Sequence, residues 1–461
     1  MLETYPQSIS KHNQPKRIPQ TGGLPLVGAL PEFLKNPFGF LVQARETYGD
    51  LYRLNLGVTD VVMLNHPRQI QHVLLDQAHN YRKGGAVWDA IRMQMGNGLL
   101  VSEGDFWLRQ RRMMQPQFHR QRLAALAALT VDAIAETLDT WERVAAGEAF
   151  DLVSAFDHLT MKVTTRTLFG ARLTAHEMEE VAEVVTYAVN YTLRAMVLNA
   201  LPAWMPAPGR RRFQQVIAQM DRIVYRIIAV GQQKSSPENH LLAMLLDAVD
   251  EETGEGMTDQ QLRDEVTTLL IAGYETTSTM LSWAFDFLVR YPEVMQKLQG
   301  EVDAVLAGRR PTFADLPKLA YMRMVLYETL RLRPSAWQVP RLTIADDEID
   351  GYRIPAGTNI MALIYMCHRH PDEWPDPEQF DPERFSVERS EGRHNLAWMP
   401  FGAGQRLCIG RDLSLMEGQL ALAMIAQRYQ MTPADERPAA PQLATTLRPK
   451  GSVMVKLMKR V

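Results

Sequence analysis

A glycine-rich loop that carries a cysteine is the strongest chemical signal in the chain. Residues 401–410 read FGAGQRLCIG, and a helical pattern follows from Gly410 to about Tyr429. Glycines let the backbone turn tightly and let a flat group come close. Cys408 is predicted to stand at a helix start, where the helix dipole favours a thiolate over a thiol. We therefore expect Cys408 to bind a metal ion and Arg406 to pair with a carboxylate of a cofactor.

A second unusual stretch lies inside a long segment with helical periodicity. Residues 272–279 read AGYETTST, and glycine and runs of hydroxyl residues are poor choices for a helix interior. Such departures from local preference are expected at functional sites. The glycine could admit a ligand against the helix, and the hydroxyl of Thr276 could replace a helix hydrogen bond. The alternative is a notch into which another helix packs.

Two pairs of charged or aromatic residues are weaker signals. Trp107 and Arg111 lie four residues apart, and Glu328 and Arg331 lie three apart, so each pair shares one helix face. In most proteins such pairs are exposed and contribute under about 1 kcal/mol. Their meaning depends on the other motifs of the chain.

Taken together, these motifs resemble the cytochrome P-450 superfamily of haem-thiolate monooxygenases. The cysteine loop matches at five spaced positions, which are Phe401, Gly404, Arg406, Cys408 and Gly410. Residues 328–331 (ETLR) resemble the family's Glu-x-x-Arg helix, residues 382–385 (PERF) its later Pro-Glu-Arg-Phe segment, and residues 272–276 its oxygen-activation motif. The motifs occur in the family's order, so the resemblance covers nearly the whole chain.

The resemblance implies roles for individual residues. Cys408 would be the axial ligand of the iron of haem b, and Glu275 and Thr276 would form the acid–alcohol pair that supplies protons for oxygen activation. Glu328, Arg331 and Arg384 would form a charge network. Eight further residues are expected to contact the haem, several of them at its propionates: Trp107, Arg111, Arg341, Arg406, Phe401, Gly402, Gly410 and Ala272.

The implied reaction is the insertion of one oxygen atom of O2 into an apolar organic substrate, by hydroxylation or epoxidation. A fatty acid, terpenoid, steroid or polyketide would suit. The length and residues 272–277 resemble the fatty-acid hydroxylases and microsomal members more than the shorter bacterial members of the family. Six positions are expected to line the substrate pocket: Ile271, Ala272, Tyr274, Ala336, Trp337 and Val339.

The resemblance implies a mainly α fold with a small β-rich lobe, and a haem between the long central helix and the cysteine loop. Residues 1–22 are expected to form an extended leader and residues 23–461 a single haem-thiolate monooxygenase domain. A break at 201–209 could form a lid. The local patterns predict strands at 51–56, 61–64 and 359–365, a hairpin at 348–354, and helices at 258–290, 318–332 and 410–429.

Composition excludes several classes of protein. The 50 basic and 53 acidic residues give a net charge of −3, which does not attract nucleic acid or an anionic membrane. No stretch reaches the roughly 18 apolar residues of a membrane helix, and the first twenty residues lack a signal-peptide core. The two cysteines exclude a disulfide framework. We expect a soluble, cytoplasmic protein.

Electrons are expected to come from a separate redox partner, a ferredoxin or flavodoxin with its reductase, because the chain ends soon after Cys408. Such partners are usually acidic, so a basic stretch is a candidate docking surface. The stretch consists of Arg109, Arg112, Arg120 and Arg122. An ordinary solvated face is the alternative.

Two other functions were weighed against oxygen insertion. A haem protein for sensing, isomerisation or electron transfer would not need the Glu275–Thr276 pair. A zinc site could use Cys367, His368 and His370 with Cys408, but the chain has no Cys-x-x-Cys pair. The zinc protein would be colourless.

Overall fold

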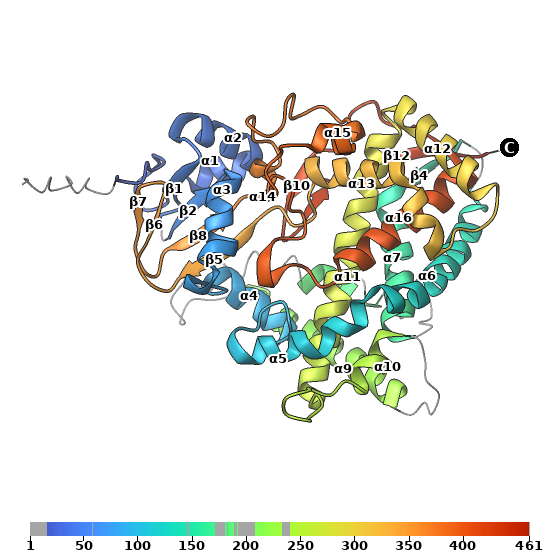
Figure 1. Ribbon diagram of the computed structural model, residues 1–461, viewed down its shortest axis with the longest axis horizontal. Coiled ribbons are helices and arrows are strands. Elements are labelled where there is room, and N and C mark those ends of the chain that lie inside the picture. Colours follow the sequence, from blue (N-terminus) through green and yellow to red (C-terminus); the bar gives the residue numbers. More distant parts are fainter. Residues whose placement is uncertain are drawn as a thin grey trace, which may run out of the picture. The chain divides into compact units, whose positions relative to one another are not determined.

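The computed structural model describes residues 16–57, 59–144, 147–170, 180–181, 183–188, 191, 208–232 and 240–460 (Figure 1). Most of the expected leader and most of the break at 201–209 lie outside the described residues. The chain divides into two compact units. The first consists of Met1–Arg82 and Arg341–Ala362, and the second of Lys83–Pro340 and Leu363–Val461. That residues 23–461 act as one catalytic domain stays a prediction.

The first unit is built on a five-stranded sheet in the order β1-β2-β8-β5-β3. Strands β1 and β2 are antiparallel, whereas β2 and β8 are parallel. Lys16 and Gln20, from the described end of the leader, form bridges to Tyr352 and Arg53. The strands of the sheet are β1 (Leu51–Asn55), β2 (Asp60–Leu64), β3 (Tyr81–Arg82), β5 (Val339–Thr343) and β8 (Asn359–Ala362).

A separate hairpin and three short helices complete the first unit. Strands β6 (Asp347–Ile349) and β7 (Tyr352–Ile354) pair antiparallel around Asp350 and Gly351, which have φ values of +53° and +81°. Positive φ at both central residues is the turn that an Asp-Gly sequence favours, so the predicted hairpin is confirmed. The helices are α1 (Leu30–Lys35), α2 (Pro37–Tyr48) and α3 (Pro67–Gln71).

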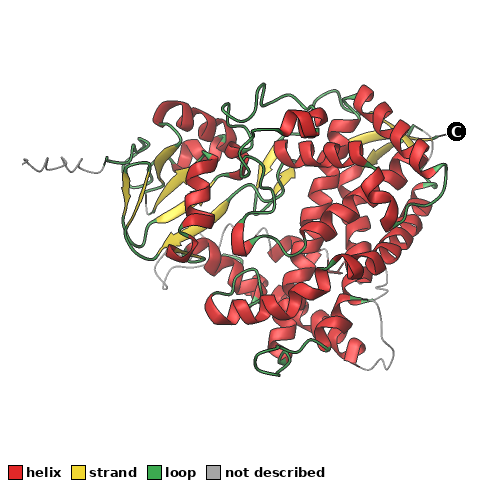
Figure 2. Ribbon diagram, viewed as in Figure 1, coloured by secondary structure: helices red, strands yellow, loops and turns green. Residues whose placement is uncertain are grey.

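The second unit is mainly helical (Figure 2). Its helices are α4 (Ala86–Met95), α5 (Gly104–Met114), α6 (Arg120–Trp141), α7 (Leu152–Phe169), α9 (Arg210–Gln232), α10 (Leu241–Leu246), α11 (Asp259–Leu288), α12 (Pro292–Leu306), α13 (Ala320–Leu332), α14 (Ile364–Cys367), α15 (Val387–Ser390) and α16 (Arg411–Arg428). Its strands are β4 (Ala149–Asp151), β9 (Tyr429–Pro433), β10 (Pro441–Leu443), β11 (Leu447–Pro449) and β12 (Met454–Lys459). They form a sheet β4-β12-β9 and a hairpin β10-β11.

Helix α11 is the long central helix that the sequence predicted. Thr258 caps it: its hydroxyl accepts a hydrogen bond from the Gln261 amide at 3.2 Å, and the Gln261 side chain accepts one from the Thr258 amide at 2.9 Å. The helix ends at Leu288, two residues before the predicted end. Its fully buried Phe285 packs against Phe156 of α7, with ring centroids 5.3 Å apart. The core of the unit is therefore built around α11.

The other predicted elements are close to those observed. The strand expected at 359–365 ends at Ala362, because the chain turns into the short helix α14. Helices α13 and α16 end within a residue of their predicted ends, and a mainly α fold with small sheets is confirmed. No described helix is long and apolar enough to span a membrane.

Candidate functional site

The cysteine loop of the second unit is shaped by two glycines. Gly402 and Gly404 have φ values of +73° and +68°, which residues with a side chain rarely adopt. The amide of Cys408 donates to the carbonyl of Phe401 at 3.0 Å and closes the loop. The predicted tight turn ahead of the cysteine is therefore present.

Gly410 lies beside the sulfur of Cys408 and is the N-cap residue of α16. Its φ of −86° does not require glycine. A Cβ at this position would lie 3.9 Å from the Cys408 Sγ, so larger side chains would crowd the sulfur. Gly410 thus keeps space open beside the thiol, as the sequence suggested.

Burial raises the pKa of the Cys408 thiol, while a hydrogen bond from the Gly410 amide and the charge of Arg111 act in the opposite direction. The expected stabilisation of the thiolate by its surroundings is present but does not outweigh burial. A metal cation bound to the sulfur would stabilise the thiolate further and so lower the pKa of Cys408.

Helix α5 contributes the aromatic and basic residues next to the loop. The Arg111 guanidinium donates to the carbonyl of Leu407 at 3.0 Å. Arg406 lies over the ring of Trp107, 3.7 Å from its centroid, and pairs with Glu103 at 2.7 Å. The structure therefore brings Trp107, Arg111 and Arg406 together at the cysteine loop. Arg406 was expected to pair with a carboxylate of the cofactor, whereas in the structure its guanidinium binds the carboxylate of Glu103.

Cys408 and Trp107 differ in their exposure within this cluster. Cys408 is exposed although protein atoms surround it closely enough to raise its pKa. Trp107 is only 7% exposed, yet its indole N–H has no hydrogen-bond acceptor among the described residues. The cluster therefore suits a group that offers an acceptor to the indole of Trp107.

Three other residues expected at the cofactor have less specific surroundings. Phe401 is half-buried, with its ring 6.5 Å from that of Trp398. Ala272 is half-buried on α11. Arg341 is buried on β5 of the first unit. Their contact with a cofactor stays a prediction.

The hydroxyl residues of α11 point to different neighbours. Thr276 donates its hydroxyl to the carbonyl of Ala272 at 2.6 Å, as expected for a threonine that perturbs its own helix. Thr277 instead lies 3.3 Å from the hydroxyl of Ser414 on α16, six residues after Cys408. A Cβ on Gly273 would meet Thr164 of α7 at 3.5 Å. The Cβ direction of Gly273 therefore points towards α7, as the helix-packing alternative expects.

Glu275 is the buried acid of the site. It is 4% exposed, accepts a hydrogen bond from the hydroxyl of Thr446 at 2.7 Å, and lies 3.9 Å from Arg448. Burial raises its pKa, and Thr446 and Arg448 lower it only in part. The carboxyl therefore holds a proton over a wider pH range than an exposed glutamate.

A second carboxyl lies beyond Arg448. Asp157 of α7 is 3.3 Å from the other end of the Arg448 guanidinium and also binds Ser278 of α11. The side chains of Asp157 and Arg448 are 23% and 22% exposed. They therefore connect the buried Glu275 to a more exposed part of the unit.

The charge network of Glu328 has the expected members. Arg331 binds both carboxylate oxygens of Glu328, at 2.7 and 2.8 Å, and both side chains are fully buried. Arg384 approaches the same carboxylate at 3.4 Å, and the amide of Asp381 donates to it at 2.9 Å. Arg331 also donates to three backbone carbonyls, of His368, Pro377 and Gln379. The network fixes the loops after α14 to helix α13.

The comparisons with known proteins now identify the family. The model of the cytochrome P450 family matches residues 18–457. This chain belongs to the cytochrome P450 family. It is 36% identical over 441 residues to cyclooctat-9-en-7-ol 5-monooxygenase of Streptomyces melanosporofaciens, across 94% of each chain. It is 36% identical over 436 residues to cyclooctatin synthase of the same organism, across 94% of this chain and 93% of the relative. It is 31% identical over 432 residues to pentalenene oxygenase of Streptomyces avermitilis, across 93% of this chain and 94% of the relative.

Family membership confirms the predicted type of reaction. This cytochrome P450 is a haem-dependent monooxygenase, which uses O2, an organic substrate and electrons from a redox partner. The resemblance read from the motifs is therefore correct.

Two side chains of the alternative zinc site, Cys367 and His368, bind other groups of this cytochrome P450. Cys367 is buried and donates to the carbonyl of Leu396 at 3.3 Å. His368 accepts from the Met399 amide at 2.8 Å through one ring nitrogen and lies 3.2 Å from the Arg331 carbonyl through the other. Within the part of the chain that the structure describes, neither cysteine belongs to a cluster of three metal-binding side chains.

His368 has a structural use that the sequence did not reveal. It links the backbone of α13 to the segment that leads into the cysteine loop. Burial and the nearby Arg331 lower its pKa to about 3, so the ring is neutral at physiological pH. The neutral ring can donate with one nitrogen and accept with the other.

Two of the six positions expected in the substrate pocket, Tyr274 and Trp337, are buried against other protein groups. Tyr274 is two residues, or about 200°, around α11 from Ala272. It is 2% exposed, and Asp157 acts on its pKa, so it lies on the side of α7. Trp337 donates its indole N–H to the carbonyl of Ala444 at 3.0 Å. These two residues support the core, while Ala336 is exposed and Val339 half-buried.

The proposed basic docking surface is partly neutralised. Asp250 accepts from Arg112 at 2.7 Å and lies 3.7 Å from Arg109. Arg109 also lies 3.4 Å from Glu255. Of the four arginines, Arg120 and Arg122 are the two that are exposed, as a basic docking surface for an acidic partner requires.

Proposed function

We propose that this cytochrome P450 hydroxylates a terpenoid, with haem b bound through Cys408. When bound, a thiolate-ligated haem activates O2 so that one oxygen atom enters the substrate. Cys408 would hold the iron, and Trp107, Arg111, Arg406 and Arg341 would hold the propionates. Phe401, Gly402, Gly410 and Ala272 would lie against the ring.

The observation that carries this assignment is the gathering of Trp107, Arg111 and Arg406 at the loop of the exposed Cys408. Among the described residues, the Cys408 sulfur belongs to no cluster of three metal-binding side chains, which suits an iron whose other ligands come from a porphyrin. Two arginines next to the sulfur suit a group with carboxylates. The unpaired indole N–H of Trp107 gives such a carboxylate one more donor. The residues present therefore fit haem.

Glu275 and Thr276 are proposed to supply the protons of the reaction. The raised pKa of Glu275 keeps a proton on a buried carboxyl next to Thr276 in the chain. To pass it on, the carboxyl must leave the hydroxyl of Thr446, and Arg448 and Asp157 lie on its path towards solvent. The hydroxyl of Thr276 can hold a water molecule once it turns away from the carbonyl of Ala272.

The relatives favour a terpenoid substrate over a fatty acid. Those named for cyclooctat-9-en-7-ol and for pentalenene cover 94% and 93% of this chain at 36% and 31% identity. The apolar residues of α11 suit such a compound without a charged anchor. These relatives give no support to the prediction that the substrate is a fatty acid.

A separate ferredoxin or flavodoxin with its reductase is proposed as the electron source, in the cytoplasm. The exposed Arg120 and Arg122 are the remaining candidates for its docking, and both cysteines are free, as in reducing compartments. Residues 23–461 would act as one catalytic domain, since the family match runs through both units.

Reconstitution with pentalenene tests the function. The purified protein, a bacterial ferredoxin, its reductase and NADPH should convert pentalenene to a product heavier by one oxygen atom. Pentalenene should also shift the Soret band from low to high spin, whereas palmitate should not. Turnover of palmitate with no response to pentalenene would overturn the terpenoid assignment.

A further inference from the structure

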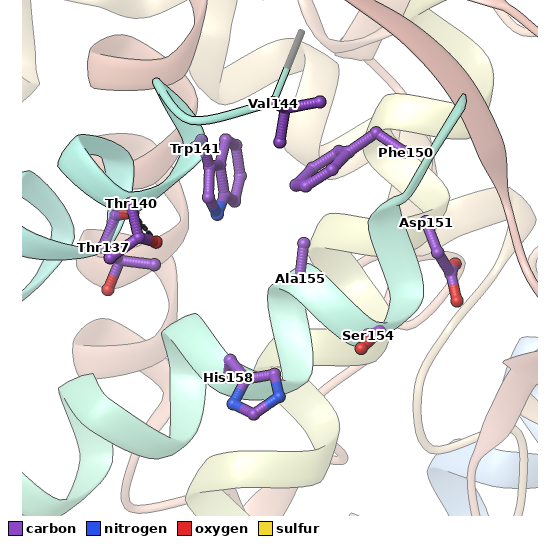
Figure 3. Close-up of a pocket in the computed structure, with 9 residues that line it drawn as sticks. All are labelled: Thr137, Thr140, Trp141, Val144, Phe150, Asp151, Ser154, Ala155 and His158. Carbon is purple, nitrogen blue, oxygen red and sulfur yellow. Dashed lines mark hydrogen bonds between the residues drawn. The ribbon is translucent and has the colours of Figure 1, made fainter. Parts of the chain in front are cut away.

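A pocket of about 380 Å³ lies in the second unit between the end of α6 and the start of α7 (Figure 3). Its volume is at the lower end of the roughly 300–1,000 Å³ of small-molecule sites. None of the residues assigned above to the haem, the proton supply or the charge network lines it. The lining residues are Thr137, Thr140, Trp141, Val144, Phe150, Asp151, Ser154, Ala155 and His158.

One wall of the pocket is aromatic and rigid. Trp141 packs edge-on against Phe150 with ring centroids 5.0 Å apart, and it also contacts Phe156 and Tyr429. Ala155 on α7 faces the rings across the pocket (Figure 3). A planar or cyclic apolar compound could therefore bind between the aromatic wall and α7.

The indole N–H of Trp141 is an unused donor in this wall. Trp141 is 4% exposed, and no acceptor for its indole N–H is found in the described part of the chain. Figure 3 shows the ring nitrogen on the edge that faces the open middle of the pocket. Five other tryptophans donate the same group to a backbone carbonyl: Trp88, Trp283, Trp337, Trp374 and Trp398.

Trp107 is the other described tryptophan with an unpaired indole N–H, and it lies in the cluster that suits haem. An indole N–H that has no acceptor in the described protein can donate to an oxygen of a ligand. Trp141 has the same property in a pocket of its own.

The other polar groups of the pocket favour a neutral ligand. The carboxylate of Asp151 already accepts from the Val153 amide at 3.1 Å and from the Ser452 hydroxyl at 2.9 Å. Thr137 and Thr140 donate their hydroxyls to carbonyls of α6. His158 is the one lining residue that can carry a positive charge, and it is exposed. An anion would therefore find no buried cation, and the indole N–H of Trp141 needs only an uncharged oxygen as its acceptor.

We propose that this Trp141 pocket binds a neutral, largely apolar ring compound whose carbonyl or hydroxyl oxygen accepts a hydrogen bond from the Trp141 indole. The site is separate from the haem cluster and does not depend on the proposed substrate.

Acetophenone and α-methylstyrene form a matched pair of probes, because they differ mainly in a carbonyl oxygen against a methylene group. The ferrous carbon monoxide form of the 15N-labelled protein would be titrated with each, and the indole signal of Trp141 assigned by its loss in Trp141→Phe. Acetophenone should shift that signal downfield and bind at least about fivefold more tightly than α-methylstyrene.

Two variants separate binding from a general change of structure. In Trp141→Phe, followed at the Ala155 amide, the two probes should bind equally. Ser154→Phe changes an exposed lining residue and should abolish the Trp141 response to both probes, which keeps the test open if Trp141→Phe does not fold. Equal affinities in the unaltered protein, or no response at Trp141 to millimolar acetophenone, would overturn the proposal and leave a pocket that holds only water.

Discussion

Two of the glutamates buried in the second unit, Glu328 and Glu275, have surroundings that differ in a way that separates structure from chemistry. Glu328 is fully buried, and Arg331 binds both of its oxygens at 2.7 and 2.8 Å. Glu275 is nearly as buried, but its hydrogen bond comes from the hydroxyl of Thr446 and its nearest arginine is 3.9 Å away. The first carboxylate has a full ionic partner, and the second does not.

The difference shows what each carboxyl can do. A buried charge is tolerated when it is paired and hydrogen-bonded, and such a group resists changes of state. A buried carboxyl with weaker partners has a raised pKa and can take up and release a proton. Glu328 therefore holds loops in place, whereas Glu275 can serve as a proton carrier.

Breaking the paired network should have the largest effect. Glu328→Ala or Arg331→Ala leaves an unpaired buried charge and should cost about 3–5 kcal/mol, with loss of haem incorporation. Haem content and thermal unfolding measure this. Asp89→Ala removes an exposed pair at the same three-residue spacing, with Arg92, and should cost under about 1 kcal/mol. Soluble Glu328→Ala protein with full haem content would show the network to be dispensable.

Glu275→Gln should behave in the opposite way, with intact folding and a large loss of activity. The amide oxygen can still accept from Thr446, but the side chain carries no transferable proton, so product formation should fall by about a hundredfold. Steady-state turnover with a matched measurement of haem content separates the two effects. Loss of haem in Glu275→Gln would contradict the proposed contrast with Glu328.

The same variant makes a prediction about pH. The pKa of Glu275 is raised above its ordinary 4.5, so between the two values the folded protein holds a proton that the unfolded chain has lost. The free energy of unfolding of the unaltered protein should therefore fall as pH rises through this window, by up to about 1.4 kcal/mol per pH unit, relative to Glu275→Gln. Parallel denaturation curves at all pH values would show that Glu275 does not titrate in this way.

Thr276→Ala and Thr277→Ala test the proton supply more finely. Thr276→Ala should bind haem and substrate and consume NADPH, but more of the electrons should emerge as hydrogen peroxide. Thr277→Ala loses its contact with Ser414 and should cost roughly 1 kcal/mol of stability, with little change in coupling. Peroxide and product are measured per NADPH consumed. Equal losses of coupling would place the proton supply elsewhere.

The smallest effect on activity is expected from a substitution of Thr446. Its hydrogen bond lowers the pKa of Glu275, so Thr446→Val should raise that pKa further and move the pH profile of coupling to higher pH. Thr445→Val, at the adjacent position, is the control. An unchanged profile in Thr446→Val would mean that this hydroxyl does not act on the proton carrier.

The sequence predicted what is encoded locally. The cysteine loop, the capped start of α11 and the Asp-Gly hairpin depend on neighbouring residues, and each has its predicted form. Thr446 could not be found in this way, because it meets Glu275 across 171 positions of the chain. The ion pairs of Arg109 and Arg112 with Asp250 were missed for the same reason.

The orientation around α11 was the main local error. Tyr274 was grouped with Ala272 by its place in the sequence, but it lies on the side of α7, and the Cβ direction of Gly273 also points towards α7. Helical periodicity gives their relative angles, and only the packing of α7 shows which face is occupied.

The central claim is that Cys408, and not Cys367, binds the haem iron. The absorption spectrum of the reduced protein with carbon monoxide tests it most directly, because thiolate ligation gives a strongly red-shifted Soret band. The unaltered protein and Cys367→Ala should show that band, and Cys408→Ala should not. A red-shifted band that survives in Cys408→Ala and disappears in Cys367→Ala would contradict the account.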